Sequence, residues 1–369
     1  MRNFPNMPIN ATARFAAAAV AGVALLASAG CSKLFHRNAS GQSSGHAAVT
    51  KVAAMQPVDL TKYQPNEAGS VPILMYHDLI TTGKQREMRY PAAQFRKDMQ
   101  WLYDNNYRPV SLTQFVQGKV DCPAGTSPVI LTFDDALRGQ FNYTGGGQID
   151  PNCVVGILDQ MHKDHPDWQT RGTFFVLTDE DSKLPPPFYQ KEYAQGKLEY
   201  LVKEGYDIGN HTVHHRHMRH MTGDQVAFEI AKAIDGIHRY IPNYDVNTLA
   251  LPYGEWPKKE SWLVSGTSGG SSYKNIAVVR AAWRPCPSSV AKGFKPYEIE
   301  RITPGTGRQQ SVWWFNYLKK NGSDRYVSDG DPNTVTVSQI AIGAVDKAKV
   351  AKLGLHMRTY SGTQMMASK

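Results

Sequence analysis

The sequence has no run of basic residues, no internal repeat and little cysteine. Its 41 Lys and Arg outnumber its 32 Asp and Glu, which gives a formal net charge of +9 over 369 residues, but the basic residues are spread along the chain. A nucleic-acid-binding arm would concentrate them, so we expect no nucleic-acid partner. The charge suits an anionic envelope or glycan equally well. With 41% hydrophobic and 20% charged residues, the composition is that of a globular protein with one large or two small domains.

Residues 1–30 are typical of a lipoprotein signal peptide. Two arginines precede an apolar stretch at residues 15–27 that is too short to span a membrane. The small residues Ser28-Ala29-Gly30 then lead to Cys31, an order that resembles the bacterial lipobox. We therefore expect export and a lipid on Cys31, with a plain secretory signal and an incidental cysteine as the alternative. Because no Asp follows Cys31, the outer membrane, facing the periplasm, is the expected anchor in a host with two membranes.

Three cysteines remain after Cys31, namely Cys122, Cys153 and Cys286. Export places them in an oxidising compartment, but three cannot all pair. A disulfide between Cys122 and Cys153 and a set of three buried free thiols are both compatible with the sequence.

The rest of the chain divides into three parts. Residues 31–70 are rich in Ser, Gly, Ala, Gln and Pro without a sustained period, which predicts a flexible tether. Residues 71–305 alternate short β-rich runs with amphipathic stretches and form the predicted main domain. Residues 306–369 are expected to be an extension that packs on this domain. Within the extension, residues 337–353 look helical, and Trp313-Trp314 favours packing over sugar stacking.

The alternating elements predict an α/β fold. Strands are predicted at residues 71–77, 129–133, 172–177, 206–209 and 248–251, and helices at residues 91–106, 154–163, 188–204 and 223–240. Strands that alternate with helices indicate a parallel sheet, and in a chain of this length a closed or nearly closed (β/α) barrel is the natural arrangement. Polar residues directly after the strands are therefore the ones that should carry chemistry.

Two such positions carry unusual side chains. Asp134-Asp135 follow the second predicted strand, where they either perform different tasks on opposite sides of the chain or simply cap a helix. Five histidines lie between His211 and His220, which is hard to justify as packing. His211 and His215 have a spacing that lets both bind one metal. By spacing alone, two other pairs remain open. They are His214 with His217, and His217 with His220.

A third position is Pro252-Tyr253-Gly254 after another strand, where a tight turn can aim a backbone N–H at a developing oxyanion or can be a plain turn. In this order, Thr132-Phe133-Asp134-Asp135, His211-Thr212-Val213-His214-His215 and Pro252-Tyr253-Gly254 resemble the polysaccharide deacetylases of the NodB-homology group, carbohydrate esterase family 4. The resemblance covers about residues 71–304. It implies a single catalytic domain with a distorted (β/α)₇ barrel, a TIM-like fold.

The resemblance also implies residue roles. Asp134 would be the general base, and Asp135, His211 and His215 would hold a divalent metal ion, with Zn²⁺ expected first and Co²⁺ or Ni²⁺ as alternatives. Tyr253 would give its backbone N–H to the oxyanion.

Two departures from the common family pattern concern the acid and the partner of the base. The first predicted strand ends at His77, which resembles the permuted order of poly-N-acetylglucosamine deacetylases, so His77 is favoured as the acid over His356. Ala250 stands where many members carry an Arg that pairs with the base. Either another cation, such as Arg280 or Arg301, orients Asp134, or the pKa of Asp134 is less strictly tuned.

The expected function is metal-dependent removal of acetyl groups from an envelope or extracellular polysaccharide of the N-acetylglucosamine type. A catalytically weak, lipid-anchored carbohydrate-binding protein on the same barrel is the alternative, motivated by Ala250 and the displaced acid. A His-rich metal-binding lipoprotein is a third reading, but it leaves the Asp pair unexplained.

Overall fold

The computed structural model describes residues 58–86, 88–180 and 183–361. The predicted signal peptide, Cys31 and most of the predicted tether lie outside these residues. None of the helices in the described part of the chain has the length and apolarity needed to cross a bilayer.

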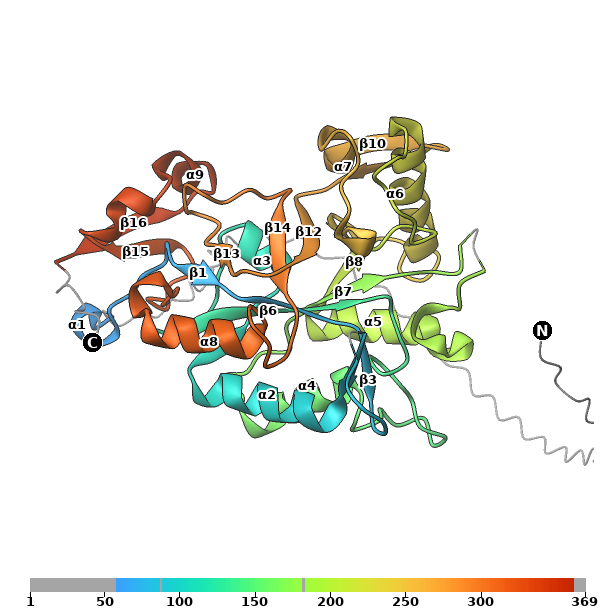
Figure 1. Ribbon diagram of the computed structural model, residues 1–369, viewed down its shortest axis with the longest axis horizontal. Helices are drawn as coiled ribbons and strands as arrows, with labels where there is room; N and C mark the ends of the chain where they lie inside the picture. The colour runs from blue at the N-terminus through green and yellow to red at the C-terminus, as the bar shows by residue number, and fades with distance from the viewer. Residues whose placement is uncertain (1–57, 87, 181–182, 362–369) are drawn as a thin grey trace, which may run out of the picture. The chain divides into compact units, whose positions relative to one another are not determined.

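Seven parallel strands form a closed barrel (Figure 1). In barrel order they are β2 (Ile73–Tyr76), β14 (Ile299–Ile302), β12 (Ala277–Ala282), β9 (Thr248–Ala250), β8 (Asp207–Asn210), β7 (Thr173–Val176) and β6 (Ser127–Asp134). Pairing of β6 with β2 closes the ring, and β5 (Tyr107–Pro109) adds to the outer side of β6. The β14–β2 seam holds a single aligned pair, Ile302 and Leu74, so the barrel is distorted there. The prediction of a distorted (β/α)₇ barrel is confirmed.

All four predicted helices are present. They are α2 (Ala92–Asp104), α4 (Val154–Asp164), α5 (Ala194–Glu204) and α6 (Gly223–His238). Helix α5 begins six residues later than predicted, because Pro185-Pro186-Pro187 and the left-handed backbone of Phe188 and Tyr189, with φ of 59° and 57°, prevent an earlier start. Figure 1 shows α2, α4 and α5 on the same side of the barrel.

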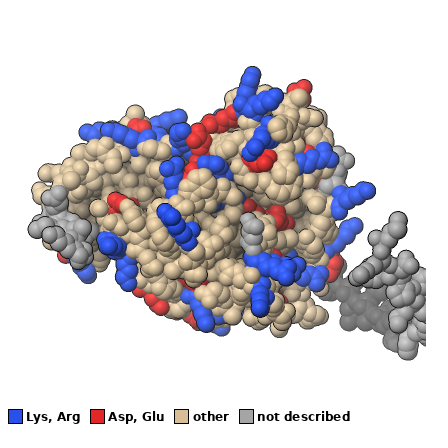
Figure 2. Space-filling view, viewed as in Figure 1, with Lys and Arg blue, Asp and Glu red and all other residues tan. Residues whose placement is uncertain are grey.

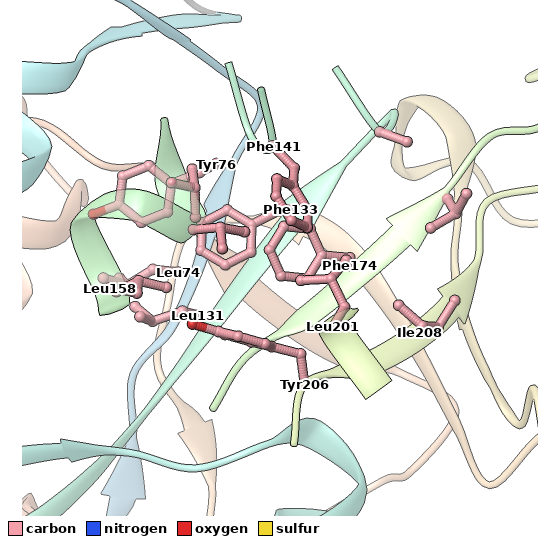
Figure 3. Close-up of a cluster of buried hydrophobic side chains, with 14 of the residues drawn as sticks. Leu74, Tyr76, Leu131, Phe133, Phe141, Leu158, Phe174, Leu201, Tyr206 and Ile208 are labelled. Carbon is pink, nitrogen blue, oxygen red and sulfur yellow. The ribbon is translucent and has the colours of Figure 1, made fainter. Parts of the chain in front are cut away.

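Successive residues of each barrel strand face opposite sides. Leu131, Phe133 and Phe174 pack outward against the helices, and the rings of Phe133 and Phe174 stack with centroids 4.7 Å apart (Figure 3). Ile130 and Phe175 belong to a separate buried cluster inside the barrel. The two-residue period of a strand then requires Asp134, at the end of β6, to point inward as Ile130 does.

The carboxyl-terminal part packs through helix and sheet. Helix α8 (Ser311–Lys320) places the Phe315 ring 5.2 Å from Trp101 of α2 and 5.0 Å from Tyr107 of β5. Beyond it, β15 (Thr334–Ser338) pairs with β16 (His356–Tyr360), and a short helix α9 (Lys347–Lys352) connects them. The expected helix over residues 337–353 is therefore confirmed only at Lys347–Lys352 and is wrong at its start, where apolar, β-branched residues join a sheet.

The last part of the predicted tether is structured. Helix α1 (Leu60–Tyr63) and strand β1 (Ser70–Val71) form there, and the buried Glu67 accepts hydrogen bonds from the backbone N–H groups of Asp329 and Thr336. A carboxylate held by two distant N–H groups fixes residues 58–70 against the carboxyl-terminal extension.

The three cysteines in the described part of the chain, Cys122, Cys153 and Cys286, are free and buried. The disulfide between Cys122 and Cys153 that the sequence allowed is not formed. Burial raises the pKa of each thiol, so these groups behave as small apolar side chains.

Candidate active site

Asp134 and Asp135 lie at the carboxyl end of β6 and point different ways. Asp134 is only 2% exposed and faces the barrel interior. Asp135 and Ala136 take left-handed backbone conformations, with φ of 76° and 49°. Residues other than glycine adopt this conformation at a cost, and such costs gather at functional sites. The turn keeps both carboxylates at the same end of the barrel.

Arg301 of β14 clamps Asp134. Its two terminal nitrogens donate to Asp134 Oδ1 at 2.6 Å and to Oδ2 at 2.7 Å, and one also donates to Thr132 Oγ1 at 3.1 Å. Burial raises the pKa of Asp134, but the adjacent guanidinium outweighs burial and holds this pKa well below its usual range. Of the two arginines named as candidates, Arg301 pairs with Asp134, whereas Arg280 donates to Glu300 at 2.8 Å.

His211 and His215 converge on Asp135. His211 Nε2 lies 3.3 Å and His215 Nε2 lies 3.6 Å from Asp135 Oδ1. The Nδ1 of His211 is 3.0 Å from the Ala250 carbonyl oxygen. Because a carbonyl oxygen can only accept a hydrogen bond, Nδ1 carries the proton, and the lone pair of Nε2 points toward Asp135.

This cluster fits a metal ion. Asp135 Oδ1 is buried and has no hydrogen-bond partner, and one ligand atom from each of Asp135, His211 and His215 lies within 4.8 Å of the others. Burial lowers the pKa of His215 to about 4, which favours the neutral imidazole that a metal requires. Two imidazoles and one carboxylate form a donor set that divalent transition metals accept.

The neighbouring histidines face elsewhere. His214 Nδ1 pairs with Glu229 Oε1 at 2.9 Å. His217 Nδ1 lies 3.1 Å from Glu255 Oε2, and its ring stacks on Tyr253 with centroids 3.8 Å apart. The structure therefore brings His211 and His215 together and separates the two alternative pairs.

Tyr253 lies at the mouth of the site. Tyr253 is 57% exposed and has a backbone φ of 57°, and the centroid of its ring is 4.8 Å from that of the His215 ring. The turn Pro252–Gly254 thus packs against one of the candidate metal ligands, as expected for a turn that follows a barrel strand.

His77 and His356 differ sharply in position. His77 Nε2 lies 3.9 Å from Asp134 Oδ2, and burial lowers the pKa of His77 against the opposing effect of Asp134 and Asp135. His356 is exposed at the start of β16, in a two-stranded sheet separate from the barrel. Only His77 reaches the cluster around Asp134.

The polysaccharide deacetylase family matches residues 122–265, which hold Asp134, Asp135, His211, His215 and Tyr253. This chain carries a polysaccharide deacetylase domain. The recognition made from the sequence is confirmed. His77 and Arg301 lie outside the matched segment. They are assigned to the same domain because β2 and β14, which carry them to the site, are strands of the closed barrel.

The deacetylase domain is similar to curated and solved proteins. A chitooligosaccharide deacetylase from Bradyrhizobium sp. (strain ANU 289) is 23% identical over 212 residues, which are 53% of this chain and 84% of that one. BC0361, a polysaccharide deacetylase from Bacillus cereus, is 16% identical with a TM-score of 0.47 over 65% of this chain and 66% of that one, just under two thirds of its length. IcaB from Ammonifex degensii is 14% identical with a TM-score of 0.44 over 64% of this chain and 92% of that one.

Two supporting residues of the deacetylase domain escaped the sequence interpretation. Gln140 is fully buried, and its Nε2 donates to the backbone carbonyl oxygens of His77 and Asp134, which ties β2 to β6. Glu229 of α6 accepts from both the backbone N–H and the ring of His214. A usable signal existed for Glu229, because it lies on the apolar face of α6 between Val226 and Ile230, where a charge needs a partner.

Proposed function

We propose that this chain is a metal-dependent hydrolase that removes acetyl groups from an N-acetylglucosamine-type polysaccharide. The family match supports deacetylation of a polysaccharide, and the relative named as a chitooligosaccharide deacetylase supports the substrate class. One observation carries the proposal. The buried, unpartnered oxygen of Asp135 faces two imidazole nitrogens beside a second carboxylate that Arg301 keeps ionised.

A divalent cation, with Zn²⁺ first and Co²⁺ or Ni²⁺ as alternatives, would supply Lewis acidity toward an acetyl carbonyl when Asp135, His211 and His215 hold it. Asp134 is the proposed base, because it is ionised at neutral pH and can accept a proton from the attacking water. His77 is the proposed acid for the departing amine or alkoxide, and the Tyr253 N–H is the proposed donor to the oxyanion.

The enzyme is preferred to a catalytically weak binding protein on the same barrel. That alternative drew on Ala250 and on an acid displaced from its common position. Arg301 occupies the place of the missing guanidinium, and His77 lies 3.9 Å from Asp134. Both reasons for doubting turnover therefore lose their force.

Acetate release tests the function. Chitooligosaccharide, poly-N-acetylglucosamine, peptidoglycan and acetylxylan are each incubated with the metal-loaded protein, and acetate is measured enzymatically. We expect release from at least one N-acetylglucosamine polymer and a loss of about 1,000-fold or more in Asp134→Asn, since the base is removed. Metal-loaded protein that releases acetate from none of the four contradicts the proposal.

The acid is tested by a matched pair of variants. His77→Ala is expected to lower kcat by about 100-fold, and His356→Ala is expected to leave kcat near that of the unmodified protein. A larger loss in His356→Ala would overturn the assignment of His77.

We also propose that the protein is exported and anchored to the cell envelope through a lipid on Cys31. The support is the apolar stretch and the small residues before Cys31 in the sequence. Cells that express the unmodified protein and Cys31→Ser are labelled with radioactive palmitate and fractionated. Label in the membrane fraction that disappears in Cys31→Ser is expected, and equal labelling of the two proteins argues against the anchor.

A further inference from the structure

A groove of about 520 Å³ opens beside His77. One wall comes from the end of β2 and from the segment that leads into β4 (Arg89–Pro91), and the other comes from Thr303, Pro304 and Gln310, which follow β14. A volume of this order is typical of small-molecule sites. Since His77 lines the groove and lies 3.9 Å from Asp134, the groove is continuous with the proposed active site.

The groove carries two arginines without a direct partner. Arg86 and Arg89 both line it, and mutual backbone hydrogen bonds of 3.0 Å hold the two residues side by side. Both are exposed, and neither guanidinium makes a hydrogen bond or an ion pair with any residue that the structure describes. Figure 2 shows Lys and Arg side chains gathered over the region of β3 (Asp78–Ile80), toward the viewer.

The remaining polar lining is neutral. Among the described residues, Gln85, Thr303 and Gln310 line the groove and no carboxylate does. Arg89 is near enough to Asp78 to oppose the upward effect of burial on the pKa of that carboxyl, but Asp78 Oδ1 accepts the Gly139 N–H at 3.0 Å and forms no ion pair within 4.0 Å. Two positive charges beside uncharged donors and acceptors therefore face an open groove.

We propose that this groove binds an anionic sugar residue next to the acetylated one, with Arg86 and Arg89 holding its carboxylate. The inference rests on the proposed function and narrows it to acidic polysaccharides. Guanidinium groups match a carboxylate in shape and charge, and amide and hydroxyl side chains suit the sugar hydroxyls. A neutral glycan would offer neither guanidinium group a counter-charge.

Two matched ligands test this. One is an oligosaccharide that alternates N-acetylglucosamine with glucuronic acid, and the other is the same oligosaccharide with every carboxylate reduced to a primary alcohol. Calorimetric titration into the metal-loaded protein should show at least tenfold tighter binding of the acidic form at about 20 mM salt. Raising the salt concentration to about 0.5 M should remove most of that difference, because exposed charges are screened.

Variants locate the charge. In R86Q/R89Q the ratio of the two dissociation constants should fall at least tenfold, whereas K319Q/K320Q, which removes the same charge from the exposed end of α8, should keep the ratio of the unmodified protein. Melting temperatures establish that both variants fold. The proposal is overturned if the unmodified protein binds the two ligands equally well. It is also overturned if the ratio of the two dissociation constants is the same in R86Q/R89Q as in the unmodified protein.

The anionic subsite and the proposed deacetylase function are tested by different measurements. Because the titration reports dissociation constants and not acetate release, the anionic subsite can be confirmed or overturned even if no acetate appears. Acetate released equally well from the acidic and the reduced oligosaccharide supports the deacetylase and contradicts the anionic subsite.

Discussion

Asp134 and Arg301 form a buried ion pair, and removal of either side chain alone should destabilise the fold. Both are almost fully buried and joined by two hydrogen bonds, so loss of the guanidinium leaves a carboxylate in the barrel interior without its counter-charge. We expect Arg301→Met to lower the free energy of unfolding by about 3–5 kcal/mol and to raise the pKa of Asp134. Urea unfolding measures the first effect.

Arg280→Met is the matched control. Arg280 donates to Glu300 at 2.8 Å but is about one quarter exposed, so its loss should cost only about 0–1 kcal/mol. An Arg301→Met loss no larger than that of Arg280→Met would show that Arg301 is not needed to compensate Asp134.

Glu229 of α6 binds the segment that carries His211 and His215. It accepts from the backbone N–H of His214 at 3.0 Å and from the ring at 2.9 Å, one residue from the proposed ligand His215. Groups that orient metal ligands are typically worth about 10- to 100-fold in affinity. Glu229→Ala should therefore weaken Zn²⁺ binding by about tenfold in a chelator-competition titration, while Glu199→Ala on the exposed face of α5 should leave it unchanged. Equal affinities in the two variants would contradict this role.

At the scale of elements, α5 is tied to the site by a buried lysine. Lys197 Nζ donates to Phe141 O at 2.8 Å, Phe188 O at 3.4 Å and Gln190 Oε1 at 2.6 Å, and the Phe188 N–H in turn donates to Ala136 O at 2.7 Å. Ala136 follows the proposed ligand Asp135. The lysine therefore holds together three segments, including the turn that presents Asp135.

Lys197 gives a stability effect with a defined sign. Burial lowers its pKa from 10.5 to about 8, so between pH 8 and 10.5 the unfolded chain binds more protons and stability from this group rises with pH. Below pH 8 both states are protonated and the contribution is flat.

Lys197→Met should therefore lose more stability, relative to the unmodified protein, at pH 10 than at pH 7.5. The increase is on the order of 2 kcal/mol, on top of about 1–3 kcal/mol for the carbonyl groups left without a donor. Melting curves at both pH values measure it. Lys203→Met, at an 81% exposed side chain, is the control, and a pH-independent loss in Lys197→Met would contradict the lowered pKa.

Barrel strands with strong local patterns were predictable, whereas β12 and β14 were not. The strand ending at Asp134 is eight residues long and buried throughout, and α6 carries a regular apolar face. By contrast β14 is four residues, Ile-Glu-Arg-Ile, in which two adjacent charged residues lie between isoleucines. Such a segment is typical of an exposed edge strand, and only closure of the barrel buries Arg301.

At the scale of the whole molecule, the proposed metal site joins two distant parts of the barrel. Asp135 follows β6, whereas His211 and His215 follow β8, so a bound ion links turns that β7 separates. A ligand that binds only the folded state stabilises it by mass action, by about 2.7 kcal/mol at a concentration 100 times its dissociation constant. We expect Zn²⁺ to raise the melting temperature of metal-free protein by several degrees.

Asp135→Asn should lose most of that rise, because the amide is a poorer ligand than a carboxylate. His220→Ala, an exposed histidine of the same segment, should keep the full rise. The reverse ranking of the two variants in thermal melts would place the metal at one of the alternative histidine pairs.

The sequence by itself determined the elements and the residues at their ends. Hydrophobic runs and periods are local, so they mark where a strand stops, and the predicted stops at His77, Phe133 and Gly209 place Asp134, Asp135 and His211 at one end of a barrel. The resemblance to a family then chose among the histidines.

Only the tertiary structure decided which cation meets Asp134, which polar groups stay without a partner and how residues 58–70 pack. Arg301 and Asp134 are 167 residues apart, and no local pattern links them. Their pairing, like the open groove beside His77, depends on the order of the strands in the barrel. That order is determined only when the whole barrel forms, because only then are both faces of each strand buried.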